Sequence, residues 1–262
     1  MKVIVFLLLV ISCMGCCSFI QPKLSGREAA TREADETVAL VYTNDEGRTH
    51  VYCSAVFISK NVILTAAHCI YGATNYINSE HEDDDSYIPI LPANLKVQFT
   101  MIKELTEVRK NPSATHSATI KSLYKFEDIA LLDITNPNSL PEHRIAKLAD
   151  EAPVAGDRLS FMGHPDGFYW SYIEGVCSSI RSDLNMVPIS GPFIQVSAPV
   201  WKGNSGGCAY NEDEKCVGIA SFLNPEAPDQ VFYIHTETIR GILIGQQIIK
   251  AKLNLFEKDP EI

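Results

Sequence analysis

Residues 203–207 read Gly-Asn-Ser-Gly-Gly, and this stretch decides the fold together with two segments that precede it. Residues 65–69 read Thr-Ala-Ala-His-Cys, and residues 126–132 read Phe-Glu-Asp-Ile-Ala-Leu-Leu. Each segment alone has an ordinary explanation, such as a tight turn, a strand end or a capped turn. Together they contain a histidine, an aspartate and a serine in that order, separated by 60 and then 77 residues.

His68, Asp128 and Ser205, with their neighbours, closely resemble the trypsin/chymotrypsin superfamily of serine hydrolases. The resemblance covers roughly residues 37–250. It implies that Ser205 is the nucleophile, that His68 takes and returns its proton, and that Asp128 holds the imidazole in the required tautomer. We therefore expect a serine endopeptidase. A non-catalytic binding protein on the same fold and an esterase-type hydrolase are the alternatives.

The glycines around the serine have a separate expected role. A tight turn can aim the backbone N–H groups of Gly203 and Ser205 at one point, which forms an oxyanion hole. Each such donor lowers the barrier by about 3 kcal/mol.

The rest of the chain is built from short β-rich runs separated by turn residues, and only the C-terminus has helical periodicity. This pattern predicts an all-β fold of paired barrels with a C-terminal helix, and the family resemblance implies that the barrels are antiparallel and six-stranded. The expected peptidase domain covers residues 36–250. Its predicted parts are a first barrel over 36–140, a second over 141–235 and a helix over 236–252, followed by a tail over 253–262.

The first residues predict export. One lysine and a short apolar run form a leader over residues 1–17, too short to span a bilayer. The sequence Val-Ile-Ser-Cys resembles a bacterial lipoprotein cleavage box, which would lipidate Cys13 and tether the chain to a membrane. Ordinary cleavage between Ser12 and Ser18 is the alternative. Residues 18–35 are polar, and we expect a flexible tether there.

Five cysteines follow the leader, so at least one of them has no partner among the others. The family resemblance implies a disulfide between Cys53 and Cys69. Cys208 and Cys216 flank a hairpin-like insert and form the preferred second pair, although Cys177 competes for Cys208. The cysteines and histidines do not recur at the spacing typical of zinc ligands, and we expect no metal and no cofactor.

Two features depart from the digestive members of the superfamily. Asn204 stands where those zymogens carry the aspartate that pairs with a newly cut N-terminus, and no Ile-Val-Gly-Gly-like start precedes Thr37. We therefore expect a protein that is active without N-terminal cleavage. Gly-Asn-Ser-Gly, with Gly-His-Pro at residues 163–165, resembles the bacterial glutamyl endopeptidases and heat-shock-type proteases more closely.

The sequence constrains the choice of substrate less than it constrains the reaction. No acid lies at the position where trypsin-like enzymes read basic residues, and Ala220 replaces the histidine of the glutamyl enzymes. Ser221 matches the serine that lines the first specificity pocket and supports the buried aspartate, with an ordinary strand serine as the equal alternative. The expected pocket is apolar and is lined by Pro199, Val200, Ser221, Phe222 and Leu223.

The net charge of the chain limits the classes of molecule that it can bind. The net charge of −10 disfavours nucleic acid, and we expect a monomer that acts on polypeptides. The acidic loop at residues 80–85 is either a calcium ligand set or a solvated charge run.

Overall fold

The computed structural model describes residues 26–43, 48–70, 96–101, 115–182, 184, 189–224 and 227–258. The leader, Cys13, the first part of the expected tether, the acidic loop at 80–85 and the last four residues lie outside these ranges.

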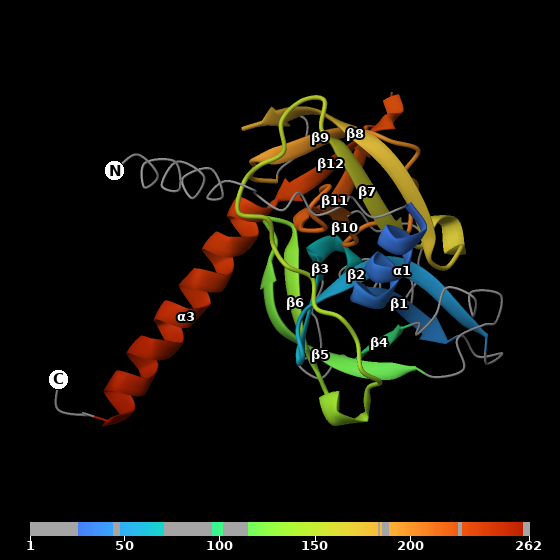
Figure 1. The fold of residues 1–262 in the computed structure, drawn as a ribbon. Helices are drawn as coiled ribbons and strands as arrows, with labels where there is room; N and C mark the ends of the chain where they lie inside the picture. Colours follow the sequence, from blue (N-terminus) through green and yellow to red (C-terminus); the bar gives the residue numbers. More distant parts are fainter. Residues whose placement is uncertain are drawn as a thin grey trace, which may run out of the picture.

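The strands form two closed antiparallel barrels of six strands each, which confirms the predicted fold class (Figure 1). The first barrel has the order β1-β2-β3-β6-β5-β4. Its strands are β1 (Thr37–Thr43), β2 (Thr49–Ser59), β3 (Val62–Ala66), β4 (Lys96–Thr100), β5 (His116–Tyr124) and β6 (Ile129–Ile134).

The second barrel has the order β10-β11-β12-β9-β8-β7. Its strands are β7 (Arg158–Gly163), β8 (Ser171–Arg181), β9 (Phe193–Ser197), β10 (Cys208–Tyr210), β11 (Cys216–Asn224) and β12 (Ala227–His235). The connection between the barrels carries one short 3-10 turn, η3 (Pro137–Ser139), and a second such turn, η4 (Pro165–Gly167), follows β7.

Strands at the junction of the barrels are apolar on both faces. In β6, Ala130 and Leu132 face the core of the first barrel, whereas Ile129 and Leu131 belong to the cluster shared with the second barrel. Successive side chains of a strand point to opposite faces, so a strand with two buried faces needs a continuous apolar run. This explains why the run that follows Asp128 is uninterrupted by polar residues until Asp133.

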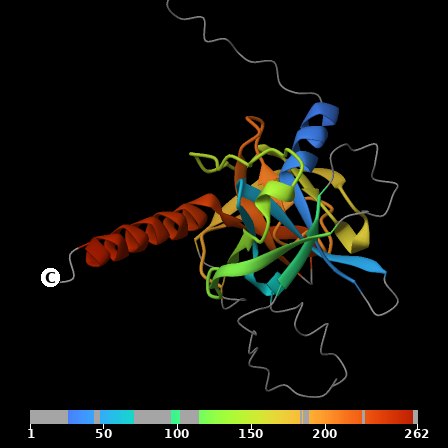
Figure 2. The same ribbon diagram turned by 90° about the horizontal axis from the view of Figure 1, so that it is seen from below.

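The C-terminal helix α3 (Thr236–Lys258) is longer than the expected 236–252, so most of the expected tail is helical. The reason is local, because residues 251–258 contain no glycine or proline, and the first proline is Pro260. Its first three turns contact the barrels, through Ile239, Ile242 and Leu243 and through Gln246, which donates to Ser122 and Tyr124 of β5. The remainder projects from the body (Figures 1 and 2). No helix in the described ranges combines the length and apolarity needed to span a membrane.

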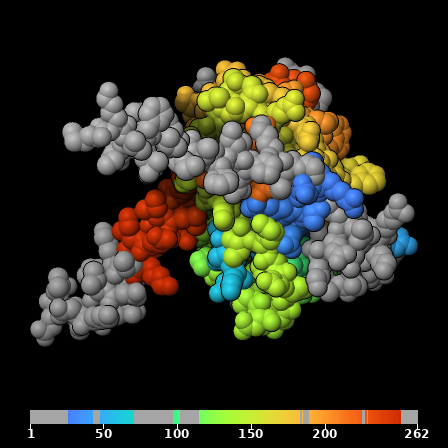
Figure 3. All heavy atoms as spheres, viewed as in Figure 1, coloured from blue at the N-terminus to red at the C-terminus, as the bar shows by residue number. Residues whose placement is uncertain are grey.

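The expected flexible tether is corrected in its described part, because residues Gly26–Glu36 form the helix α1. Ala30 and Ala34 are buried on one face, against Met162 and Trp170 of the second barrel. Alanine, arginine and glutamate favour a helix, and this burial supplies the tertiary contact that a short helix requires. The polar composition suggested a tether because the apolar face consists only of alanines. The helix lies on the surface where the two barrels meet (Figure 3).

Glu33 docks this helix through a buried carboxyl group. The side chain is 3% exposed, and one of its oxygens accepts a hydrogen bond from the Ser160 hydroxyl of β7. Burial raises the pKa of Glu33 from 4.5 to about 8, and the nearby Glu36 and Glu174 act in the same direction. Between pH 4.5 and about pH 8, the Glu33 carboxyl group is therefore protonated in the folded chain and ionised in the unfolded chain.

The substitution Glu33→Gln should flatten the pH dependence of stability. Because the folded-state pKa is the higher one, the stabilising contribution is complete below pH 4.5 and is lost as the pH rises through about 8. Between pH 5 and pH 8, the unfolding free energy of the natural chain should fall relative to that of the Glu33→Gln chain by on the order of 3 kcal/mol in urea unfolding. The comparison with the variant cancels the contributions of other titrating groups, such as His164. The exposed Glu151→Gln is the control. Parallel curves for the natural chain and Glu33→Gln would contradict the prediction.

Candidate active site

His68 and Asp128 are brought together by the pairing of β3 with β6. Ala66 pairs with Ile129, so the residues that follow β3 and precede β6 meet at one end of the first barrel. The N–H of Ala67 donates to the carbonyl oxygen of Asp128 at 3.0 Å. The backbone N–H of His68 donates to Oδ1 of Asp128 at 2.9 Å, and Nδ1 of the ring lies 2.9 Å from Oδ2.

Asp128 is a buried acceptor at the junction of the barrels. It is 3% exposed, and its backbone has a left-handed φ of 51°. Ser221 of β11, in the other barrel, donates its hydroxyl to Oδ2. A carboxylate that accepts from Nδ1 leaves Nε2 of His68 as the ring acceptor. The side chain of His68 is 45% exposed, so this acceptor can be reached from solvent.

The loop of Ser205 contacts the first barrel directly. The N–H of Ser54 in β2 donates to the carbonyl oxygen of Ser205 at 2.8 Å, and Sγ of Cys69 lies 3.5 Å from the same oxygen. The carbonyl group of Ser205 therefore contacts the residue that follows His68 in the chain. No hydrogen bond joins the Ser205 hydroxyl to the His68 ring in the described residues. Such contacts often tighten only when substrate is bound.

The backbone N–H groups of Gly203 and Ser205 have no acceptor within the described part of the chain. Gly203 has a φ of 96°, and a side chain there would lie 2.3 Å from the carbonyl oxygen of His164. Two hydrogen bonds fix the loop on either side: Asp166 N–H donates to the Lys202 carbonyl at 2.6 Å, and the Ser54 hydroxyl donates to the Gly203 carbonyl at 2.8 Å. The free donors are therefore held in one orientation.

Asn204 is buried beneath this loop and carries no charge. Its amide Nδ2 donates to the carbonyl oxygen of Trp201 at 3.0 Å. Gly163 packs so closely that a Cβ there would lie 2.1 Å from Oδ1 of Asn204. The neighbouring His164 is fully buried and accepts from the Trp170 N–H at 3.0 Å. Burial lowers the pKa of His164 to about 3, so this ring is neutral.

The cysteines pair as the sequence suggested. Cys53 is bonded to Cys69 and Cys208 to Cys216, while Cys177 is free and buried. Burial raises the pKa of the Cys177 thiol. One group of possible metal ligands lies within 4.8 Å in the described residues, formed by His68 and the first disulfide. Its sulfurs are already bonded to each other and offer no thiolate, so this group does not fit a metal site.

The five predicted pocket residues have different surroundings. Val200 is 2% exposed and packs in the core of the second barrel. Phe222 is half-buried and stacks on Phe232 with ring centroids 4.8 Å apart. Pro199 is exposed, Leu223 is half-buried against the core, and Ser221 contacts Asp128. Val200 therefore offers a substrate little surface, and Pro199 has the most exposed side chain of the five candidates.

Sequence reasoning missed two parts of the site. Ser54 was not singled out, although its N–H and hydroxyl both hold the loop of Ser205. Asp166 was missed because its contribution is a backbone N–H in a turn with a φ of 48°, which no residue-type motif signals.

Residues 53–219, more than half of the chain, match the sequence family described as a trypsin-like peptidase domain. The periplasmic pH-dependent serine endoprotease DegQ of Escherichia coli is 39% identical over 93 residues, which are 35% of this chain and 20% of DegQ. The periplasmic serine endoprotease DegP of Salmonella typhimurium is 38% identical over 104 residues, which are 39% and 21% of the two chains. The serine protease HTRA1A of Danio rerio is 30% identical over 120 residues, which are 45% and 25%. The chain thus spans a fifth to a quarter of the length of these relatives.

Solved structures agree in fold. The HtrA-type protease AlgW with a tripeptide superposes with a TM-score of 0.62 at 20% identity, covering 87% of this chain and 65% of AlgW. The active form of the Rv3671c protease from M. tuberculosis gives 0.60 at 15% identity, covering 84% and 85%. The relatives confirm the expected likeness to the heat-shock-type branch. The chain belongs to the family of trypsin-like peptidase domains, with relatives of the DegP and HtrA type.

Proposed function

We propose that this chain is an exported serine endopeptidase that cleaves peptide bonds through an acyl-enzyme. The observation that carries the proposal is the set of hydrogen bonds around Asp128. Its carboxylate accepts from His68 and Ser221 beside a loop that presents Ser205 and two unpaired N–H groups. The family match and the protease relatives support the same reaction class.

In the first step, the Ser205 hydroxyl attacks the carbonyl carbon of the substrate and its proton passes to Nε2 of His68. Asp128, hydrogen-bonded to Nδ1, stabilises the imidazolium that forms. The oxygen of the tetrahedral intermediate accepts from the N–H groups of Gly203 and Ser205. As the carbon–nitrogen bond breaks, His68 returns the proton to the leaving amine, and water then hydrolyses the ester in the same manner.

The enzyme is active without N-terminal cleavage. Asn204 cannot form an ion pair with an ammonium group, and its Nδ2 already donates to the carbonyl oxygen of Trp201. The loop that carries the oxyanion donors is instead held by Ser54 and Asp166, which are present in the uncut chain. No step of activation is therefore needed to orient Gly203.

The first specificity pocket is apolar and does not select basic side chains. Pro199 and Leu223, with Ser221, are its proposed lining, and they offer no charged group.

Export rests on the leader over residues 1–17 and on the likeness to relatives described as periplasmic. The processed chain begins either at a lipidated Cys13 or at a cleavage site between Ser12 and Ser18.

Ser205→Ala should abolish peptide cleavage. Removing the nucleophile lowers kcat/KM by roughly a thousandfold or more. The measurement is mass spectrometry of a diverse peptide library incubated with each form of purified residues 18–262, with the exposed Ser178→Ala as the matched control. We expect Ser178→Ala to retain the profile of the unsubstituted protein. Equal, empty profiles for all three proteins would overturn the peptidase assignment.

An N-terminal extension should leave activity intact. A chain with a removable tag before residue 18 should cleave the library at the same rate before and after the tag is cut, because Asn204 needs no new N-terminus. Activity that appears only after cutting would refute the proposal of intrinsic activity.

The mature N-terminus can be read from mass. Whole-protein mass spectrometry of the exported chain should show the loss of the leader, with or without added lipid on Cys13. An intact Met1 terminus would contradict export through this leader.

A further inference from the structure

Residues 162–170 form a segment that lies between α1 and the loop of Ser205. This bridging segment contains the end of β7, the turn η4 and the residues that lead into β8. It takes no part in the proposed chemistry. One side of it nevertheless packs on α1, and the other side borders Gly203.

Trp170 connects α1 to the interior of the bridging segment. Its side chain packs against Ala30 and Ala34, and its backbone N–H donates to Nδ1 of His164 at 3.0 Å. The rings of Trp170 and His164 also meet edge to face, with centroids 5.0 Å apart. Because His164 is completely buried in a close-packed interior, its position depends on that of Trp170.

His164 in turn contacts the loop of Ser205 through its backbone. A Cβ at Gly203 would lie 2.3 Å from the His164 carbonyl oxygen, so the two backbones touch. Two residues later, the N–H of Asp166 donates to the Lys202 carbonyl oxygen at 2.6 Å. That carbonyl and the Gly203 N–H belong to one planar peptide unit and point in opposite directions. The hydrogen bond from Asp166 therefore sets the direction of the Gly203 N–H.

The backbone of the bridging segment needs support from its surroundings. Asp166 and Trp170 have left-handed φ values of 48° and 50°, although neither is a glycine. Such conformations cost on the order of 1–3 kcal/mol each and persist only where neighbouring contacts enforce them. α1 supplies part of that support, because its alanines cover the side chain of Trp170.

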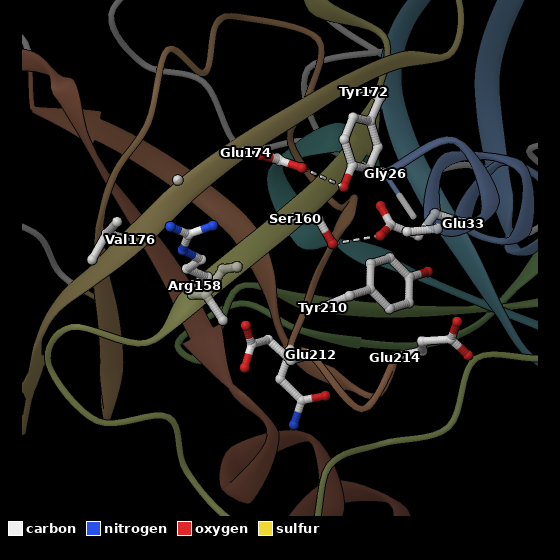
Figure 4. A pocket seen from close by; sticks show the side chains of 14 residues that line it. Gly26, Glu33, Arg158, Ser160, Tyr172, Glu174, Val176, Tyr210, Glu212 and Glu214 are labelled. Carbon is white, nitrogen blue, oxygen red and sulfur yellow. Dashed lines mark hydrogen bonds between the residues drawn. The ribbon is translucent and has the colours of Figure 1, made fainter. Parts of the chain in front are cut away.

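The apolar contact of α1 is local. The cluster formed by Ala30, Ala34, Met162 and Trp170 is separate from the clusters of the barrel cores. Earlier in the helix, Gly26 borders a cavity of about 600 Å³ that β7 and β8 also line (Figure 4). A substitution within the cluster should therefore loosen α1 without entering either barrel.

The same helix is also attached to β7 by a hydrogen bond. The Ser160 hydroxyl donates to a carboxyl oxygen of Glu33 (Figure 4). Ser160 lies two residues before the bridging segment on the same strand, so α1 holds the entry to the segment as well as Trp170 at its end.

We propose that α1 positions the oxyanion donor of Gly203, through Trp170 and the bridging segment. The helix holds Trp170, Trp170 holds His164, and the residues from His164 to Asp166 orient the peptide unit of Lys202 and Gly203. Trp170 and His164 are therefore positioning residues, which act on the transition state only through the Gly203 N–H. The proposal goes beyond the proposed peptidase function and rests on it only for the kinetic measurements.

The first test separates kcat from KM for a peptide that the natural chain cleaves. Ala34→Arg puts a long charged side chain at a buried position and should displace α1, whereas Thr31→Arg puts the same side chain on the exposed face of the helix. An oxyanion donor stabilises the transition state rather than the bound substrate. We therefore expect Ala34→Arg to lower kcat by about tenfold or more and to change KM by less than about threefold.

Thr31→Arg should keep both constants within about twofold of the natural values. Circular dichroism verifies that both variants are folded. Equal kcat values for Ala34→Arg and Thr31→Arg overturn the proposal, as does a loss that is confined to KM.

His164 offers a matched pair of variants that leave α1 unchanged. His164→Asn keeps an acceptor oxygen near the position of Nδ1, whereas His164→Leu has a similar size and no acceptor. We expect His164→Leu to lower kcat as Ala34→Arg does, and His164→Asn to retain at least about a third of the natural kcat. Equal kcat values in the pair overturn the role of the hydrogen bond between Trp170 and His164.

The second test needs no catalysis. Within the loop of Ser205, the N–H groups of Asn204 and Gly207 donate to the carbonyl oxygens of Trp201 and Asn204. Hydrogen exchange read by mass spectrometry should be at least about fivefold faster at these amides in Ala34→Arg than in Thr31→Arg, with exchange in β12 unchanged. Ala34→Leu, a smaller intrusion at the same site, replaces Ala34→Arg if exchange in β12 rises as well.

Unchanged exchange in the loop of Ser205 overturns the proposal, whether or not the chain cleaves peptides. A chain that cleaves no peptide while its loop responds to the displacement of α1 would overturn the peptidase function and support the coupling between α1 and Gly203. The two proposals can therefore fail separately.

Discussion

The carboxylate of Asp128 is the interaction on which the site depends, because it belongs to one barrel and accepts hydrogen bonds from both. His68 reaches it from the same end of the first barrel, and Ser221 reaches it from β11 of the second. A carboxylate that is 3% exposed is costly to bury unless it is satisfied by donors, and here three donors meet it. The same carboxylate therefore orients the histidine and helps to hold the two barrels together.

The barrels reinforce this arrangement through strands that are buried on both faces. β6 sends Leu132 into its own barrel and Leu131 into the shared cluster, so the strand after Asp128 cannot move without disturbing two cores. Close-packed interiors resist such shifts. The loop of Ser205 is fixed in the same way, since its carbonyl oxygen accepts from β2 and its Gly203 cannot carry a side chain beside His164.

Much of this was predictable, because three short motifs require particular residue types and barrels require alternating strands. The resemblance of these motifs to the trypsin/chymotrypsin superfamily implied the nearness of His68 to Asp128 and the bond between Cys53 and Cys69. The many short strands indicated paired barrels, and the hairpin-like insert indicated the bond between Cys208 and Cys216. The helix α1 did not, since a face made of Ala30 and Ala34 gives almost no hydrophobic signal and becomes apolar only against Met162 and Trp170. Ser54 was also hidden, because its importance comes from an approach of the two barrels that no single segment encodes.

Helices α1 and α3 each connect the second barrel with the first. α1 rests on Met162 and Trp170 of the second barrel and leads directly into β1 of the first. α3 leaves β12 of the second barrel, and its Gln246 donates to Ser122 and Tyr124 of β5 in the first. The two helices therefore connect the barrels at two separate places. One barrel could slide over the other only if the contacts of both helices were broken. The contacts of α1 and α3 therefore resist shear between the barrels and so help to preserve the spacing between His68 and Asp128 of the first barrel and Ser205 of the second.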